Sequence, residues 1–515
     1  MLAGLLLAAQ HRRVQDPHVR YHRFDLPAFD AYAYVAMAEQ PAFFTLAPWG
    51  YRVLTPWLAR VLPGPNVLRG FRALNLAAVG AAAVLLFLFL RRLGLATAPS
   101  LAGLAAFLLS PPVTELVKNP FLADASTLAL ESAFVLAVEA GAGIPALALI
   151  SALGALSKES FFLFVPLVYL ARRSRDGEAR ALAGAAVALA AGLAAALVLR
   201  GWWTPHLRTP VPALQADTLR AAGQNLAAFL SRQAWGRWYF AGLALAATAA
   251  AMRAPGRLFL ARYGYVLVAA TAAPFFNPVV FSPGDVRRLL VHALPSLVPL
   301  ALLAAWPVKE QLAPDAARAR VPWFPAAAAL AAVAVIAAPL LVADRYRRAD
   351  FGGRRDGPLV LAFCRDSLRT ARRLERGEAV NFDPESRRFE WGVSDPGELE
   401  RMRWFLREGW GDTPHYGTGE IVMQAPEATL VLPCLTPRDL RLTLEMRAPS
   451  PRAGAVLVNG RPVGAWHASP AGEAASALVP ASTLFRGDNL VTLAAAAGVA
   501  APVRLARLTV APAGP

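Results

Sequence analysis

Cysteine is nearly absent from this sequence. Its 515 residues include only Cys364 and Cys434, and neither lies in a C-x-x-C pair or among clustered histidines. A structural zinc site therefore has no support, because such sites need closely spaced Cys and His ligands. Both cysteines fall in the C-terminal third. If that part lies outside the cytoplasm, the two thiols could pair, and a chance pair of buried thiols is an equal alternative.

Acidic residues are also scarce relative to basic ones. The chain has 52 Lys and Arg against 35 Asp and Glu, a formal charge of +17, and only 17% of its residues are charged. Apolar residues make up 56% of the chain and are gathered in runs. This pattern excludes an ordinary soluble enzyme and predicts a polytopic membrane protein. Its basic excess is first explained by cytoplasmic loops and anionic lipid headgroups, rather than by nucleic acid.

The apolar runs predict a polytopic α-helical fold of about eleven membrane spans. The first run, residues 1–10, has about half the ~20 residues that a spanning helix needs, so either this helix is short or the true start lies earlier. A cleaved signal peptide would need a basic segment before this run, and none is present. The other predicted spans are 73–90, 101–113, 126–142, 144–157, 160–171, 181–199, 238–252, 258–276, 289–306 and 322–342.

Basic residues give these spans an orientation. Arginines and lysines follow alternate spans and fall on one side, which the positive-inside rule assigns to the cytoplasm. The opposite side then receives the polar loops that contain the candidate site residues, together with the C-terminal part. We therefore expect a protein of the bacterial inner membrane whose site and C-terminal domain face outward.

The composition changes abruptly after residue 342, from apolar runs to polar sequence punctuated by Gly and Pro. We expect a transmembrane domain at 1–342, an α-rich connecting region at 343–424 and an all-β sandwich at 425–515. Two helices are expected in the connecting region, at 356–377 and 397–411. Alternating apolar and polar residues, separated by turn signals such as Asn459-Gly460, predict the strands. These strands are expected within 428–433, 439–448, 453–468, 489–496 and 503–512.

A polar and aromatic stretch, residues 21–60, precedes the first long apolar run. Asp25 and Asp30 lie here, in a segment too apolar for an ordinary solvated loop. From Asp30 onward, Tyr34 and Met37 recur at helical spacing, which predicts an amphipathic helix in the membrane interface. Acids held there would sit at the edge of the lipid. Both aspartates could instead cap helices, since Asp is a preferred N-cap residue.

Two more polar groups fall on the same predicted side. Asp124 lies at the mouth of a span, where an N-cap role is equally plausible. Lys158 and Glu159 lie between two short apolar runs, and ionisable residues at membrane depth are costly enough to suggest function. A local salt bridge between these two, stabilising a helical hairpin, is the alternative.

A third group, Arg287, Arg288 and His292, lies at the predicted outer start of a span. Arg288 and His292 are four residues apart, which predicts that they share one helix face. Arginines on the outer side run against the positive-inside bias. Guanidinium groups bind phosphate bidentately, which would suit them to a phosphate leaving group. Contact with a lipid headgroup is the alternative.

The order and common side of these motifs resemble the GT-C class of membrane glycosyltransferases that use polyprenyl-phosphate sugars. The first loop shows an acid, then Y-x-x-M-A, a Pro and Y-R-x-L-x-P-x-L-A, and the later motifs are the Asp124 loop, the K-E-S turn and the Arg287 turn. The resemblance covers residues 21–292. It implies a general base at Asp30 or Asp25, with Asp30 favoured because Y-x-x-M-A follows it directly. It also implies Asp124 beside the donor phosphate or a metal, phosphate ligands at Lys158, Arg287, Arg288 and His292, and support from Glu159, Tyr34 and Arg52.

The C-terminal third carries a second resemblance. The V-L-V-N-G-R-x-V-G hairpin and the later F-R-G-D-N-x-V run resemble galactose-binding-like, jelly-roll carbohydrate-binding modules. This implies a β-sandwich that could hold a glycan acceptor.

Together the two resemblances imply inverting transfer of a sugar from a polyprenyl-phosphate donor to an envelope glycan, lipid or protein. The donor, the acceptor and membrane lipids are the expected partners. No cofactor is required, although Asp30 and Asp124 would permit Mg²⁺ or Mn²⁺. A non-enzymatic transporter or flippase of lipid-linked glycans is the main rival, and an assembly factor is a third reading. Transporters more often show repeated halves, and this sequence shows no internal repeat.

Overall fold

The computed structural model divides the chain into two compact units. The first comprises Met1–Tyr21 and Ala47–Asp350 and is helical, and the second comprises His22–Leu46 and Phe351–Pro515. The change of unit near residue 350 lies close to the predicted change of composition, whereas the segment 22–46 groups with the C-terminal unit. The residues described are 4, 6, 8, 26, 29–39, 51–62, 67–199, 216–232, 234–276, 283–306, 366–383, 388–389, 405–406, 409–410, 421–423, 425–496 and 502–514.

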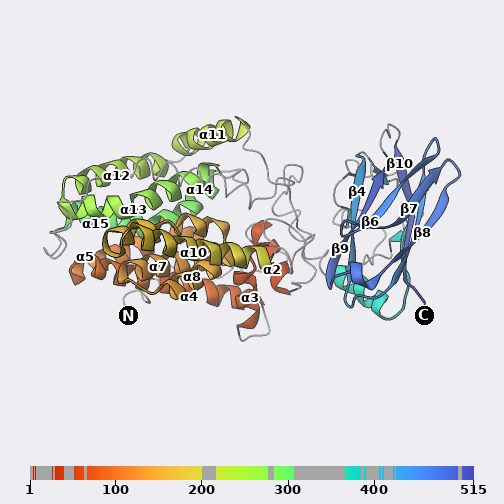
Figure 1. Cartoon of the computed structure of the whole chain (residues 1–515). Coiled ribbons are helices and arrows are strands. Elements are labelled where there is room, and N and C mark those ends of the chain that lie inside the picture. The colour runs from red at the N-terminus through yellow and green to blue at the C-terminus, as the bar shows by residue number, and fades with distance from the viewer. Residues whose placement is uncertain are drawn as a thin grey trace. The chain divides into compact units, whose positions relative to one another are not determined.

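The helical unit is a bundle in which helices distant in sequence pack through apolar side chains. Helices α4, α7, α8 and α10 lie side by side within it (Figure 1). Its helices are α3 (Leu54–Val61), α4 (Val67–Arg92), α5 (Thr97–Leu108), α6 (Pro111–Lys118), α7 (Asp124–Ala140), α8 (Ile144–Ser157), α9 (Leu167–Asp176), α10 (Glu178–Val198), α11 (Ala216–Arg232), α12 (Ala234–Ala251), α13 (Ala254–Ala272), α14 (Pro283–Leu289) and α15 (Leu294–Ala305). Short 3₁₀ turns are η3 (Glu159–Leu163), η6 (Ala273–Phe276) and η7 (Leu290–Ala293).

Four helices of the described residues are long and apolar enough to cross a membrane, or five if one bent pair forms a single span. The four are Val67–Arg92, Glu178–Val198, Ala254–Phe276 and Val286–Ala305, and the pair is α5 with α6, bent by 51°. A membrane protein is therefore supported, and the predicted count of about eleven spans is not.

The shorter apolar runs explain the difference in count. Helix α8 has 14 residues, which at about 1.5 Å each falls well short of the ~30 Å hydrocarbon core. The predicted span at 160–171 is a 3₁₀ turn followed by the arginine-rich helix α9. These runs pack against protein instead of reaching across lipid. The predicted span at 322–342 lies outside the described residues, as does most of the short one at 1–10.

The predicted sides of the loops correspond to two ends of one bundle. Arg91 and Arg92 end α4 at one end, where Arg172 of α9 donates to the carbonyl oxygen of Ala142 and Arg262 of α13 pairs with α7. The opposite end holds the starts of α4 and α7 and the end of α8, and it also carries basic side chains, among them Arg52 and Lys158. Which end faces the cytoplasm stays a prediction.

The chain turns sharply where α8 ends. Lys158, just beyond the helix, has extended backbone angles, and η3 then folds back along the helix. Gly154 makes this possible, because a side chain at this position would overlap the ring of the fully buried Phe161. The turn brings the 158–159 dipeptide to the end of the bundle that also holds the start of α7.

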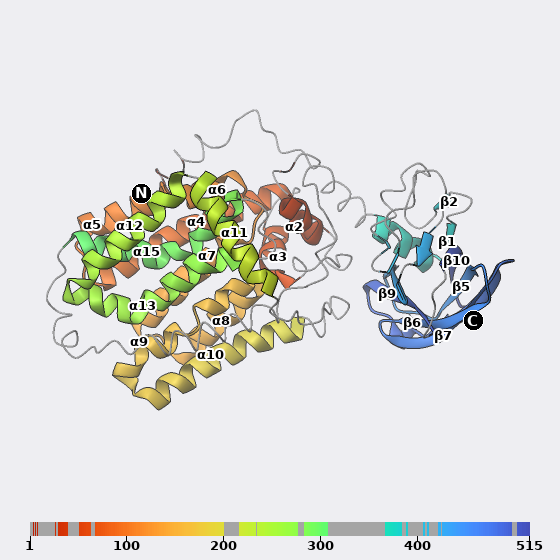
Figure 2. The ribbon, with the colours of Figure 1, turned by 90° about the horizontal axis from the view of Figure 1, so that it is seen from above.

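The second unit contains one mixed sheet that forms a half-barrel. In the described residues the strand order is β2-β1-β10-β5-β7-β6-β9-β4, with β3 on β10 and β8 on β5, and the curvature is visible in Figure 2. All pairings are antiparallel except a short one between β5 and β7. The strands are β1 (Val380–Asp383), β2 (Arg388–Phe389), β3 (Ile421–Met423), β4 (Glu427–Cys434), β5 (Leu440–Arg447), β6 (Arg452–Val458), β7 (Arg461–Ser469), β8 (Glu473–Val479), β9 (Gly487–Ala495) and β10 (Val503–Pro512). A 3₁₀ turn, η10 (Ala481–Thr483), and helix α2 (Phe29–Glu39) also belong to this unit.

The predicted β-structure is confirmed in its main strands and corrected in its architecture. All five predicted strand segments are found, and the Asn459-Gly460 turn has positive φ at both residues, 51° and 79°, as a tight hairpin requires. The strands are linked in one continuous half-barrel instead of two separate sheets. The half-barrel begins before the predicted boundary at residue 425, because it includes strands β1, β2 and β3. Strand β8 was not predicted.

The connecting region is less helical than predicted. Residues 366–375 form a helix, which confirms part of the first one. The second predicted helix, 397–411, is wrong at its described residues, because Leu406 and Trp410 form β-bridges to Leu430 and Met423. Gly409 lies between them with φ +84°, a conformation that interrupts a helix.

Cys434 is a buried thiol that forms no disulfide. Its Sγ donates to the carbonyl oxygen of Thr436 at 3.1 Å. Burial raises the pKa of this thiol to about 11. The alternative of a buried, unpaired thiol is therefore confirmed for Cys434, and Cys364 lies outside the described residues.

The buried side chain of Asn489 hydrogen bonds to several segments of the half-barrel. The amide of Asn489 donates to the carbonyl oxygens of Leu432, Phe485 and Gly487, and its Oδ1 accepts from Asn459 Nδ2 at 2.8 Å. Asn459 in turn accepts from the backbone of residue 490. The hairpin turn and the G-D-N motif are thus joined through side-chain amides.

We predict that Asn489→Ala destabilises this unit by about 3 kcal/mol, because several buried partners lose their hydrogen bonds. Hydrogen exchange of the full chain should then quicken in peptides from β4, β6 and β9 and stay unchanged in α4 and α7. Thr492→Ala, on the same strand, is the control, since it loses one half-buried bond to Thr429. Unchanged exchange in Asn489→Ala would contradict the prediction.

Candidate functional site

Asp124 is the first residue of α7 and lies buried in the bundle. The position before it, Ala123, is the N-cap, and no side chain caps the helix. The carboxylate instead accepts at Oδ1 from Lys158 Nζ, and His292 Nε2 lies 3.3 Å from the same oxygen. The N-cap alternative for Asp124 is therefore wrong.

Lys158 reaches Asp124 from the turn after α8. Its side chain is buried, and it pairs with Asp124 of another helix instead of the adjacent Glu159. Glu159 accepts from Arg52 Nε at 2.9 Å. The predicted local salt bridge is thus wrong, because each member of the dipeptide pairs with a residue distant in sequence. Close contact between the two helices is also shown by the hydroxyls of Thr127 and Ser157, which lie 2.8 Å apart.

His292 enters the same cluster from a third segment. Its ring is buried, with Nδ1 2.8 Å from Oε2 of Glu131 on α7 and Nε2 facing Asp124. Helix α14 ends at Leu289, and His292 lies in the 3₁₀ turn that follows. Arg288 and His292 nevertheless lie in one helical segment, Val286–Ala305, and both act on Asp124, which agrees with the prediction that they share one face.

The two arginines of α14 differ in their surroundings. Arg288 is half-buried and lies near enough for its charge to act on both Asp124 and Lys158. Arg287 is about one-third exposed, at 34%, and its nearest described acid is Glu115, 3.9 Å away. Arg288 therefore belongs to the cluster, while Arg287 points to its rim.

The structure thus brings together most of the predicted site residues of the helical unit. We name Asp124, Glu131, Lys158, Arg288 and His292 the charged cluster. Removing such groups from water is costly unless each is matched by a counter-charge. Two carboxylates and three basic side chains gather here. The Arg52–Glu159 pair lies beside the cluster, since the charge of Arg52 also acts on Lys158.

The remaining candidates fall elsewhere. Asp30 is half-buried in the first turn of α2, and Tyr34 is buried in the same helix, which belongs to the other unit. Asp25 lies outside the described residues. The assignment of the general base to Asp30 or Asp25 stays a prediction.

Glu131 is the member of the charged cluster that the sequence analysis missed. It lies seven residues after Asp124, on nearly the same face of α7, and is fully buried. A signal for it existed, because an acid in the middle of an apolar run is costly and therefore suggests function.

The described residues contain no group of three His, Cys, Asp or Glu side chains placed to hold a metal ion. The carboxylate oxygen of Asp124 already faces Lys158 and His292. These basic side chains balance the charge of a carboxylate that would otherwise be free to bind a cation. Participation of Mg²⁺ or Mn²⁺ stays a prediction that this pairing does not favour.

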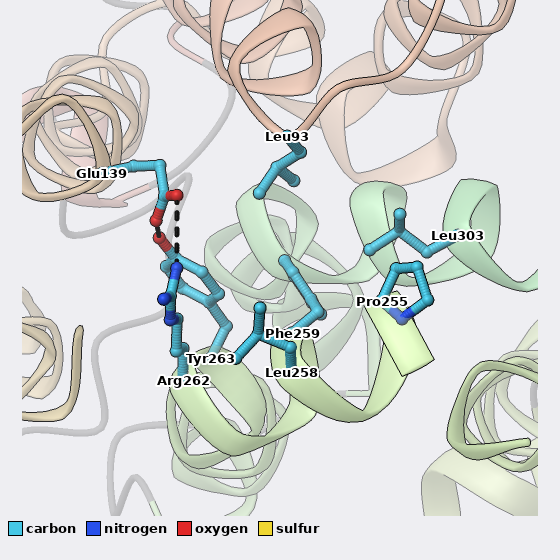
Figure 3. A pocket seen from close by; sticks show the side chains of 8 residues that line it. All are labelled: Leu93, Glu139, Pro255, Leu258, Phe259, Arg262, Tyr263 and Leu303. Atoms are coloured by element: carbon cyan, nitrogen blue, oxygen red, sulfur yellow. Dashed lines mark hydrogen bonds and ion pairs between the residues drawn. The ribbon is translucent and has the colours of Figure 1, made fainter. Parts of the chain in front are cut away.

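A small, mostly apolar pocket lies at the opposite end of α7 (Figure 3). Its polar group is Glu139, which accepts from Tyr263 Oη at 2.5 Å and pairs with Arg262 at 3.4 Å. Asp124 and Glu139 are 15 residues apart on one helix, which places them about 22 Å apart along its axis. The pocket is therefore separate from the charged cluster.

We predict that Lys158→Met destabilises the helical unit by about 3–5 kcal/mol, because Asp124 would keep a buried charge without its main partner. The double variant Asp124→Asn/Lys158→Met should recover much of that loss. Thermal unfolding of the purified chain in detergent measures both changes. Lys118→Met removes a half-exposed partner of Glu115 and should cost less than about 1 kcal/mol. Equal destabilisation by the two lysine variants would refute the assignment.

Comparison with known proteins adds no relative from which a role could be transferred to these residues. The charged cluster must therefore be interpreted from its own chemistry and position. No family model, curated protein or solved structure matches the chain.

Proposed function

We propose that this chain is an inverting glycosyltransferase that moves a sugar from a polyprenyl-phosphate donor to an envelope glycan, lipid or protein outside the bacterial inner membrane. One observation carries the proposal. Asp124, Lys158 and His292, which come from three segments distant in sequence, meet at one end of an apolar bundle, where the charge of Arg288 also acts on Asp124. A lipid-linked phosphate suits this place, because its apolar chain can lie against the apolar helices and its anionic head can bind the basic side chains.

The basic side chains fit the leaving group of this reaction. The acceptor oxygen forms a bond to the anomeric carbon while the bond from that carbon to the phosphate oxygen breaks, and its electron pair stays with the phosphate. Charge therefore develops on the phosphate in the transition state, where Lys158 and Arg288 stabilise it. The acceptor hydroxyl gives its proton to a carboxylate on the opposite face of the sugar.

Asp124 is better suited to holding Lys158 than to acting as this base. Lys158 and His292 both face its Oδ1, and a carboxylate stabilised by such partners accepts a proton poorly. We therefore keep Asp30 as the proposed base and assign to Asp124 the task of placing the Lys158 ammonium. Glu159 holds Arg52 beside it in the same way.

The half-barrel is proposed to hold the acceptor glycan. Support comes from the resemblance of the N-G-R hairpin and the G-D-N run to carbohydrate-binding modules. Asn459 and Asn489 of these motifs hydrogen bond to each other and to the backbone. The motifs therefore support this type of fold, and an acceptor would bind through other side chains.

A transporter or flippase of lipid-linked glycans is the competing proposal. It is favoured by Glu131, a fully buried acid within the bundle, because transporters place ionisable groups inside the membrane. Both proposals require a phosphate-binding cluster. They differ in that only an enzyme forms a new glycosidic bond.

We predict that the chain, purified in detergent, transfers radiolabelled sugar from at least one polyprenyl-phosphate sugar to membrane glycan extracts. Asp30→Asn should lower the rate by about 10²–10⁴-fold, because the acceptor loses its general base. Glu39→Gln, at the other end of α2, is the matched control and should stay within about twofold of the wild type.

Two other results of the transfer assay would contradict this expectation. Equal transfer by wild type and Asp30→Asn would move the base to Asp25 or Asp124. If the folded wild type transfers sugar from none of the donors tested, the result contradicts the enzyme proposal and favours the flippase proposal.

A further inference from the structure

Glu131 is a buried acid to which the transfer reaction gives no direct task. Its side chain is fully buried, Oε2 lies 2.8 Å from His292 Nδ1, and Oε1 has no hydrogen-bond partner among the described residues. A buried carboxylate with a single partner is a costly arrangement. Packing alone would be better served by an apolar side chain, as at neighbouring positions of α7.

Glu131 determines how the ring of His292 is held. Carboxylates accept hydrogen bonds, so with a proton on each nitrogen the ring donates from Nδ1 to Glu131 at 2.8 Å and from Nε2 to Oδ1 of Asp124 at 3.3 Å. An imidazole fixed through one nitrogen presents the other in a defined direction. Without Glu131, the ring can turn about its χ2 bond and lose this direction.

The orientation of the His292 ring also affects Asp124 and, through it, Lys158. Oδ1 of Asp124 faces His292 and Lys158 at the same time, so a turned ring would change the hydrogen bonding of the oxygen that holds the ammonium. We propose that Glu131 is a positioning residue for the lipid-phosphate donor. It orients His292, and His292 with Asp124 keeps Lys158 in place for the phosphate. This inference rests on the proposed function, from which it takes the phosphate ligand.

Glu139 provides a matched comparison on the same helix. Its side chain is also a mostly buried carboxylate, 11% exposed, with a hydroxyl donor, Tyr263, and a basic partner, Arg262. It lies at the opposite end of α7, in the pocket of Figure 3. Glu139→Gln therefore removes a comparable charge from α7 without touching the charged cluster.

The test is binding of undecaprenyl phosphate to the full chain in detergent, measured for wild type, Glu131→Gln, His292→Gln, the double variant and Glu139→Gln. We expect Glu131→Gln to weaken binding about 10-fold, by analogy with partners that orient ligating histidines. Glu139→Gln should stay within about twofold of wild type. The double variant should bind no more weakly than His292→Gln alone, because Glu131 acts through the ring.

Thermal unfolding of each variant accompanies the binding measurements. If Glu131→Gln does not fold, Glu131→Asp replaces it with the same expected direction, since its shorter side chain withdraws the carboxylate from Nδ1. Wild-type affinity in a folded Glu131 variant, or additive losses in the double variant, would overturn the positioning role and leave the proposed function standing. A folded wild type that does not bind undecaprenyl phosphate would remove both.

Discussion

The buried ion pair between Asp124 and Lys158 is the constraint on which the end of the bundle depends. It joins the first residue of α7 to the residue that follows α8, so it fixes two helix ends at once. Removing either charge alone would leave the other buried without its main partner. The turn made possible by Gly154 places Lys158 beside Asp124, and the 3₁₀ turn after α14 places His292 there. Two local irregularities of the backbone thus serve one electrostatic requirement.

The sequence was sufficient to find most members of the charged cluster, and insufficient to pair them. Asp124, Lys158 and His292 were recognisable because ionisable residues beside apolar runs are costly. Their partners were not, since Lys158 pairs with a residue 34 positions away and Glu159 with one 107 positions away. Adjacent opposite charges suggest a local pair, and only the packing of helices shows that each has a stronger partner elsewhere. Glu131 carried the same signal, an acid within an apolar run, and was overlooked.

A similar limit applies to the fold. Apolar runs showed where helices lie, but composition alone does not separate a helix buried against protein from one that faces lipid. Helix α7 is apolar because most of it is buried in the bundle, and it carries three acids that find partners there. In the half-barrel, strands with alternating Leu and Val were predictable. Strand β8, with the sequence EAASALV, was not, because its buried Ala477 and exposed Ala474 have the same side chain.

The distribution of charge along α7 bears on the choice between enzyme and transporter. Its acids form two separate groups, Asp124 with Glu131 at one end and Glu139 at the other. Between them lie the buried apolar residues Phe134, Val135 and Val138 and one buried hydroxyl, that of Ser132. A path that carried ions or headgroups through the bundle along α7 would need polar groups in this interval. A single hydroxyl offers little for such a path, which favours the proposed transferase over the proposed transporter.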